Sequence, residues 1–313
     1  MMHELDDNER TAEARALLGA GTREHVLKGI ELLNQAYAGG DGDAALLLAV
    51  IDAAGLGRAP NLVGAMDKLA FAASRGVGFA QAQMRLICGA ENDDVDWNSQ
   101  RQRFSLADWT HAPTKQNLCD APRVRRISRF VGRPICDWLR KRAIGRFRRA
   151  MVFDHEGGVG TIDPRRTNSE FEFTLMESDV VLLLVRARMS AAMAIPVQAF
   201  EPTKILHYAP GQHYAHHVDF LEAEDPVMAG KIAREGQRIA TCLIYLNDDY
   251  EEGETDFPRV GIKHRGVAGE ALYFANVDGA GAPDRATLHA GLAPTRGEKF
   301  VLSQWVRDRP FLN

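Results

Sequence analysis

The chain is poor in cysteine, and its few cysteines follow no metal-binding or disulfide pattern. Cys88, Cys119, Cys136 and Cys242 are scattered along 313 residues, and no two of them have CxxC spacing. The spacing indicates neither a zinc ribbon nor a disulfide framework. A reducing compartment fits best, so we expect a cytoplasmic protein.

Long hydrophobic runs and a strong net charge are also missing. The longest aliphatic run, residues 180–185, ends at Arg186 and is far too short to cross a bilayer. Residues 1–7 are acidic and lack the basic-then-apolar pattern of a signal peptide. The formal net charge is −4 at 26% charged residues, which gives no global sign of a nucleic-acid partner. We therefore expect a soluble protein with no membrane partner, and a nucleic-acid partner is not favoured.

Proline is nearly absent from the N-terminal region. Residues 12–90 are rich in alanine, leucine and glycine and contain a single proline, Pro60. Small and apolar residues recur there at an offset of 36 positions. The matching pairs are Leu33 and Leu69, Ala36 and Ala72, Gly40 and Gly76, Gly42 and Gly78, and Ala44 and Ala80. Small residues let paired helices approach closely, and glycines end one helix before the next begins.

The stretch 55–73 resembles Sel1-like repeats, which are related to the tetratricopeptide family. We predict a helical repeat region over residues 1–90. Only about two repeats are visible, fewer than such units usually need to fold by themselves. This region is therefore expected to pack against the rest of the chain. Two roles stay open for it: a packing scaffold, or a surface that docks a peptide or protein.

Residues 91–120 are polar without a clear period, and we predict a linker there. Residues 123–149 carry eleven arginines and lysines against one acidic residue, Asp137. Apolar residues at helical spacing predict a buried stripe with the charges facing outward. These apolar residues are Ile135, Trp138, Leu139 and Ile144. Docking of an acidic partner or RNA is the alternative. Residues 179–193 are predicted to form a further helix.

Beyond Glu201 the pattern becomes that of short strands. The predicted strands cover residues 203–208, 213–220, 239–246, 271–274 and 300–305, with glycine- and proline-bearing turns between them. Many short strands around a ligand pocket are typical of a double-sheet barrel or jelly roll. We therefore expect an α+β protein, with a jelly-roll domain and flanking helices over residues 121–313.

Two histidines and an aspartate in this β-rich part are the most informative residues. Residues two apart in a strand point to the same face, so His217 and Asp219 can bind one ion together. His289, 70 residues after Asp219, would complete the set from a distant strand. Such a face leaves open positions and is typical of non-haem ferrous oxygenases. His216 points to the opposite strand face and is the poorer ligand.

Ordered blocks of sequence from about residue 120 to the end resemble the prolyl 4-hydroxylase-type, Fe(II)- and 2-oxoglutarate-dependent dioxygenases. The blocks are residues 166–168, 208–219, 238–247, 252–258, 269–274 and 288–305. The resemblance implies a double-stranded β-helix fold. It also implies Fe(II) bound by His217, Asp219 and His289, with 2-oxoglutarate and O2 as cosubstrates and ascorbate as an optional cofactor.

The same resemblance assigns residues around the cosubstrate. Lys299, ten residues after His289, would pair with the distal carboxylate of 2-oxoglutarate, a charge-assisted contact strengthened by burial. Tyr208 and Thr241 would donate hydrogen bonds to that carboxylate. For these two residues the alternative is a core position with a satisfied hydroxyl.

On the substrate side, the resemblance implies Glu201, Tyr214 and Trp305. An aromatic wall suits a proline ring, which offers apolar faces and little to hydrogen-bond. Arg307 departs from the family pattern, which often has a histidine two residues after this tryptophan. Arg166 is assigned to a substrate-covering loop.

The implied activity is hydroxylation of a prolyl residue in a protein or peptide, with succinate and CO2 as co-products. Two alternatives stay open. One is a hydroxylase of a free amino acid or another small molecule, and the other is a catalytically silent adaptor whose repeats bind the partner. The intact metal-binding set together with Lys299 favours an enzyme over the adaptor.

Overall fold

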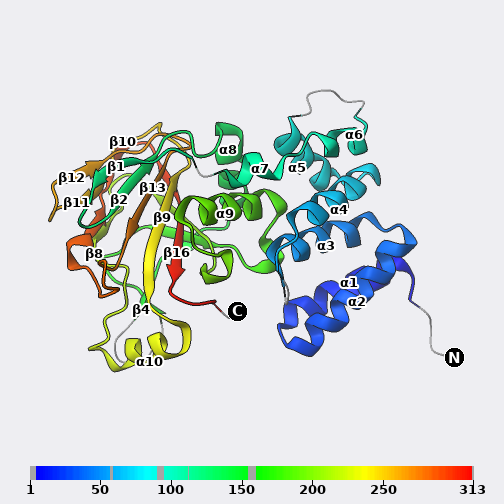
Figure 1. The fold of residues 1–313 in the computed structure, drawn as a ribbon, viewed down its shortest axis with the longest axis horizontal. Helices are drawn as coiled ribbons and strands as arrows, with labels where there is room; N and C mark the ends of the chain where they lie inside the picture. The colour runs from blue at the N-terminus through cyan, green and yellow to red at the C-terminus, as the bar shows by residue number, and fades with distance from the viewer. Residues whose placement is uncertain (1–4, 57–58, 90–94, 112, 154–159, 312–313) are drawn as a thin grey trace. The chain divides into compact units, whose positions relative to one another are not determined.

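The computed structural model describes residues 5–56, 59–89, 95–111, 113–153 and 160–311. The chain divides into two compact units, each described here by itself (Figure 1). One unit comprises Met1–His111 and Thr174–Arg188, and the other comprises Ala112–Phe173 and Met189–Asn313. Within the described ranges, no helix is long and apolar enough to span a bilayer.

The N-terminal unit is helical, as predicted. Its helices are α1 (Asp7–Ala20), α2 (Arg23–Gly39), α3 (Gly42–Ala54), α4 (Leu62–Ser74), α5 (Gly78–Cys88), α6 (Trp97–Gln102) and α7 (Leu106–Thr110). Polar side chains at the N-caps of α1 to α4 accept hydrogen bonds from first-turn N–H groups, and left-handed glycines end α1, α2, α3 and α5. Both devices satisfy backbone groups that a helix leaves unpaired at its ends.

The 36-residue sequence repeat corresponds to a structural repeat of α2–α3 and α4–α5. Gly42 and Gly78 are each the first residue of a helix. Gly40 and Gly76 both have a positive φ, at 99° and 85°. The paired leucines and alanines are all buried; they are Leu33, Leu69, Ala36, Ala72, Ala44 and Ala80. Matching positions of the sequence repeat therefore have matching structural roles. The Sel1-like assignment stays a prediction.

A later segment of the chain completes this helical core. Helix α9 (Val180–Met193) matches the predicted helix over 179–193, and its buried residues Val180 and Leu184 pack with α4 and α5. Trp97 of α6 belongs to the same core. In its described residues, the region predicted as a linker, 91–120, thus contributes α6 and α7 to the helical unit and β1 (Gln116–Cys119) to the other unit.

The second unit is built on antiparallel sheets, consistent with the predicted jelly roll. The larger sheet has the order β1-β2-β13-β9-β16-β7-β6-β3, and a smaller one has the order β12-β11-β14-β8 (Figure 1). The larger sheet contains β1 (Gln116–Cys119), β2 (Val124–Ile127), β3 (Arg148–Arg149), β6 (Ser169–Glu172), β7 (Lys204–Tyr208), β9 (Arg238–Tyr245), β13 (Ala271–Ala275) and β16 (Lys299–Arg307). The smaller sheet contains β8 (Tyr214–His217), β11 (Thr255–Phe257), β12 (Ile262–His264) and β14 (His289–Gly291). Two pairs stand apart, β10 (Glu251–Glu252) with β15 (Pro294–Arg296) and β4 (Val152–Phe153) with β5 (Gly160–Thr161).

Four of the five predicted strands correspond closely to β7, β9, β13 and β16. The fifth, predicted over 213–220, is shorter, because β8 ends at His217 and the chain bends after it. Helix α10 (Pro226–Glu235), capped by Asp225, follows this bend and was not predicted.

The basic segment forms a helix between two strands, β2 and β3, rather than one helix. Its first part is β2, and α8 (Arg133–Ala143) follows. Leu139 is buried as predicted, but Ile144 lies beyond the helix and is 56% exposed. The helix ends there because Gly145 turns the chain with a φ of 80°. Cys136 and Ala143 fill the buried face instead.

Truncating Leu33 or Leu69 to alanine should destabilise the helical unit by about 2–4 kcal/mol each, because both side chains are fully buried at equivalent repeat positions. The control is Leu27→Ala, at a side chain that is 60% exposed and should change stability by less than about 0.5 kcal/mol. Urea unfolding followed by far-UV circular dichroism measures all three. Unequal losses at the two buried leucines would show that the repeats are not energetically equivalent.

Candidate active site

His217 and His289 lie directly opposite each other across the antiparallel pair β8 and β14. Their ring centroids are 4.3 Å apart. Asp219, in the bend just after β8, reaches both rings: its Oδ1 is 3.5 Å from His217 Nε2 and its Oδ2 is 3.7 Å from His289 Nε2. One ligand atom from each of the three residues lies within 4.8 Å of the others. The three predicted metal ligands therefore converge.

The hydrogen bonds of both imidazoles leave the same nitrogen available. Nδ1 of His217 lies 2.8 Å from the Ala215 carbonyl oxygen, and Nδ1 of His289 lies 2.9 Å from that of Thr287. A carbonyl can only accept, so Nδ1 carries the proton in each ring and Nε2 keeps its lone pair. Burial, aided by the nearby His217, lowers the pKa of His289 to about 4. His289 is therefore neutral, and a competent metal ligand, at neutral pH.

Asp219 remains ionised although it is buried. Burial alone would raise its pKa, but the neighbouring His289 and His217 and a hydrogen bond from Thr241 outweigh it and hold the pKa well below its ordinary value. Two imidazole nitrogens and one carboxylate form the donor set typical of non-haem Fe(II) sites. The residues present fit that ion. His216 is not one of the three converging residues; its Nε2 lies 2.9 Å from Asp256.

A cavity lies beside the three ligands, between the two sheets. Its wall contains His217, Asp219 and His289 together with residues of β7 and β16. Because alternate residues of a strand share a face, β16 contributes every second side chain. The β16 residues are Lys299, Val301, Ser303 and Trp305, and β7 contributes Leu206 and Tyr208.

Lys299 supplies a buried cation to this cavity. Its side chain is 2% exposed, and its Nζ donates to the Gly253 carbonyl oxygen at 2.7 Å. Burial lowers the pKa of the ammonium to about 7, with Glu254 opposing the shift. Within the described residues Lys299 has no ion-pair partner, so a carboxylate entering the cavity would find an uncompensated charge there.

Tyr208 and Thr241, predicted to bind the same ligand, occupy different places. Tyr208 lines the cavity, and burial raises the pKa of its phenol, so it stays a hydrogen-bond donor. Thr241 does not line the cavity, and its hydroxyl donates to Asp219 Oδ2 at 2.6 Å. A hydroxyl has one proton, so Thr241 cannot also donate to the cosubstrate as predicted.

Thr255 takes the place in the cavity wall that was predicted for Thr241. Its hydroxyl lies 2.8 Å from that of Tyr245, so one of the two donates to the other. Thr255 falls within the sequence block 252–258, which resembles the dioxygenases, but that block alone does not distinguish one threonine from the other. Both strands contribute to the wall, β9 through Leu243 and β11 through Thr255, so the choice depends on where along its strand each threonine lies.

Aromatic residues line the cavity near the metal ligands. Tyr214 stacks on His217 at 3.5 Å between ring centroids, with an interplanar angle of 14°. The buried guanidinium of Arg166 lies 4.6 Å from the Tyr214 ring centroid, and Arg166 also lines the cavity. Trp305 belongs to the wall, and the guanidinium of Arg238 lies 3.8 Å from its ring centroid.

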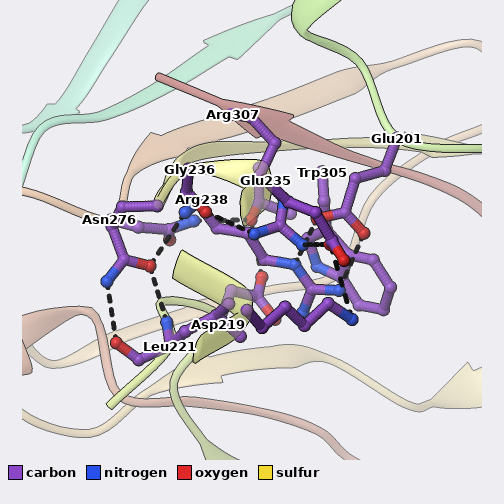
Figure 2. Close-up of polar contacts among 12 residues, drawn as sticks. Glu201, Asp219, Leu221, Glu235, Gly236, Arg238, Asn276, Trp305 and Arg307 are labelled. Carbon is purple, nitrogen blue, oxygen red and sulfur yellow. Dashed lines mark hydrogen bonds and ion pairs between the residues drawn. The ribbon is translucent and has the colours of Figure 1, made fainter. Parts of the chain in front are cut away.

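Glu201 does not line the cavity but supports Arg238 from behind. Its two carboxylate oxygens accept hydrogen bonds from Arg238 Nε at 2.6 Å and Nη2 at 2.8 Å (Figure 2). Such a bidentate pair fixes the guanidinium plane. The predicted direct contact between Glu201 and substrate is therefore replaced by support of Arg238, a residue that the sequence did not single out.

Arg307 is a structural residue in this cluster. It is fully buried, and its Nε lies 2.5 Å from Glu201 Oε1. Its Nη1 donates to the Gly236 carbonyl oxygen at 2.5 Å, and its Nη2 lies 3.2 Å from Glu235 at the end of α10 (Figure 2). Burial would raise the pKa of Glu201, but Arg238 and Arg307 outweigh it and lower that pKa. Arg307, the last residue of β16, thus links the end of α10 to the larger sheet.

Comparison with known proteins adds an independent observation. Residues 203–307 match the family model of the 2OG-Fe(II) oxygenase superfamily. The chain is 30% identical over 219 residues to "Probable prolyl 4-hydroxylase 6" of Arabidopsis thaliana, covering 64% of this chain and 74% of the relative. It is 29% identical over 203 residues to "Prolyl 4-hydroxylase 1" of the same plant, covering 60% and 70%. A solved structure of the viral collagen prolyl hydroxylase vCPH from Paramecium Bursaria Chlorella virus-1, in complex with 2OG, is 27% identical and covers 61% of this chain and 98% of that one, with a TM-score of 0.45.

Replacing His289 by alanine should weaken Fe(II) binding by at least about 100-fold, because one of three ligands is lost. The matched control is His216→Ala, next to a ligand but paired with Asp256, which should change the affinity by less than about threefold. Anaerobic equilibrium dialysis against Fe(II) measures both. Equal losses in the two variants would contradict the ligand assignment.

Proposed function

The chain belongs to the 2OG-Fe(II) oxygenase superfamily, among its prolyl 4-hydroxylase-type members, and from that premise we propose that it hydroxylates a prolyl residue of a protein or peptide. The reaction is Fe(II)- and 2-oxoglutarate-dependent, with succinate and CO2 as co-products. The observation that carries the proposal is the convergence of His217, Asp219 and His289 beside a cavity that holds the buried Lys299. A metal set and an anion-binding cation in one cavity are what this chemistry requires.

The metal would be held by His217 Nε2, His289 Nε2 and the Asp219 carboxylate. Bound together with 2-oxoglutarate and O2, Fe(II) would couple the oxidation of the ketoacid to the breaking of an unactivated C–H bond, with O2 as the oxidant. The protein supplies geometry and exclusion of water. No side chain has to act as a general base, so none is assigned that role.

The cosubstrate would be anchored by its distal carboxylate at Lys299. Tyr208 and Thr255 offer hydroxyl groups from the same wall. Gly291 leaves room for the Tyr208 hydroxyl, since a Cβ at that position would lie 2.9 Å from the phenol oxygen. A charge-assisted bond in this buried setting is stronger than one at the surface.

The substrate side of the proposal rests on the aromatic wall. Tyr214 and Trp305 offer flat apolar faces that suit a proline ring, and Arg238, held by Glu201, lies against Trp305 as a polar group for the peptide backbone. Relatives with the name prolyl 4-hydroxylase support a prolyl substrate over a free small molecule.

Three finer parts of the proposal concern the helical repeats, the location of the protein and a further cofactor. We propose that the helical repeats dock the protein substrate, as Sel1-like repeats would, and that the protein acts in the cytoplasm. Ascorbate is proposed as an optional cofactor that keeps the metal ferrous.

Affinity for 2-oxoglutarate should depend on pH through Lys299. The ammonium is charged below its pKa of about 7 and neutral above it, and only the charged form attracts the dianion. The dissociation constant should therefore be flat below about pH 7 and rise by up to tenfold per pH unit above it, with proton uptake on binding. Calorimetry in buffers of different ionisation enthalpy measures both effects. Lys299→Met should bind at least about 30-fold more weakly and lose the pH dependence; an unchanged profile in that variant would contradict the assignment.

Turnover tests the substrate class. Succinate release should require Fe(II), should rise when a proline-containing peptide is added, and should respond at least about tenfold less to free proline, because the aromatic wall and Arg238 are proposed to contact a peptide. Mass spectrometry of the peptide should show a gain of one oxygen atom on a prolyl residue. Stimulation by free proline but not by any peptide would favour a small-molecule hydroxylase, and no succinate with any substrate would favour the adaptor.

A further inference from the structure

Asp219 is the one metal ligand that strand pairing does not hold. His217 and His289 are paired with each other in β8 and β14. Asp219 lies in the bend that follows β8. Its carboxylate therefore needs another constraint to keep one orientation between the two imidazoles.

Thr241 supplies a rigid donor to this carboxylate. It is 1% exposed and lies in β9, where its backbone is paired with Phe274 on one side and Trp305 on the other. Its hydroxyl donates to Asp219 Oδ2 at 2.6 Å. A threonine has few χ1 choices because it is β-branched, so the donor is aimed by the strand itself.

Asn276 directs the Thr241 hydroxyl. The Asn276 side-chain Nδ2 donates to Thr241 Oγ1 at 3.0 Å. Asn276 is fully buried just after β13, and its own backbone is fixed by bonds to Ile239 and Asp284. Because Thr241 Oγ1 accepts from Asn276, its single proton is left for Asp219.

The orientation of the Asn276 amide follows from the same chain. Within the described residues, Asn276 Oδ1 is buried without a hydrogen-bond partner in the protein. The reversed amide would take the Thr241 proton on Oδ1 and leave Nδ2 unpaired instead. That arrangement keeps one buried polar atom unpaired and also removes the bond to Asp219, so it is the less favourable of the two.

We propose that Asn276 and Thr241 form a one-way hydrogen-bond chain that orients the Asp219 carboxylate for metal binding, and that both are positioning residues of the site. The proposal rests on the proposed function, because the metal is the one which that function requires. Neither residue touches the metal, the cosubstrate or the substrate.

The test measures metal affinity and not only turnover. Full-length protein is titrated anaerobically with Fe(II), and with Co(II), whose visible spectrum reports the ligand geometry. Thr241→Val keeps the shape and removes the donor, and it should weaken binding of both metals about 10- to 100-fold and change the Co(II) spectrum. Thr241→Ser restores the donor and should stay within about threefold of the wild type. Asn276→Leu leaves the Thr241 proton undirected and should fall between these two variants.

Thr255→Val is the matched control. This threonine lines the cavity but has no bond to Asp219, so its loss should leave metal affinity within about twofold while it weakens 2-oxoglutarate binding. The melting temperature of each metal-free variant checks folding. If Thr241→Val does not fold, the metal affinities of Thr241→Ser and Asn276→Leu test the proposal in its place.

The outcomes distinguish a failure of the positioning chain from a failure of the proposed dioxygenase function. Wild-type metal affinity in a folded Thr241→Val variant, or equal losses in Thr241→Val and Thr255→Val, would overturn the positioning chain and leave the dioxygenase proposal standing. A wild-type protein that binds neither metal would overturn both.

Discussion

The site depends on one buried negative charge. Asp219 is ionised inside the protein, where an unpaired carboxylate is costly. A threonine hydroxyl donates a hydrogen bond to this charge, and two imidazoles place their unprotonated nitrogens 3.5 and 3.7 Å from its oxygens, so that three electron-rich groups converge. A divalent cation between these groups is the natural counter-charge, and two imidazoles with one carboxylate are the donor set typical of non-haem Fe(II).

The two sheets contribute different functional groups to the cavity. The smaller sheet brings His217 and His289 together through a single cross-strand pair, while β16 of the larger sheet carries Lys299 on the opposite wall. The cosubstrate fits this division, since one end of 2-oxoglutarate chelates a metal and the other end is a carboxylate. Further along β16, Trp305 and the supported Arg238 extend the same wall toward the substrate. Under the proposed function, one strand would serve both cosubstrate and peptide recognition.

Sequence reasoning succeeded where local pattern and chemistry agree. The metal ligands and Lys299 stand out because their chemistry is unusual at that spacing, and long strands such as β9 and β16 follow from their apolar, β-branched composition. The sequence did not predict the role of a residue where that role depends on how strands pack. Thr241 and Thr255 are chemically identical, and only their places in the folded sheets put one hydroxyl against Asp219 and the other residue in the cavity wall. Glu201 has the same limitation, because a buried carboxylate between two arginines looks in sequence like any acidic residue.

The central claim is that a metal and a ketoacid share this cavity, and one titration tests it directly. Anaerobic addition of 2-oxoglutarate to the Fe(II)-loaded protein should produce the visible charge-transfer absorption of a ketoacid chelated to ferrous iron. The band should saturate with equal amounts of metal and cosubstrate, and it should be absent from a protein that lacks the Asp219 carboxylate. A wild-type protein that binds Fe(II) but never develops the band, or a band that persists without Asp219, would contradict the account.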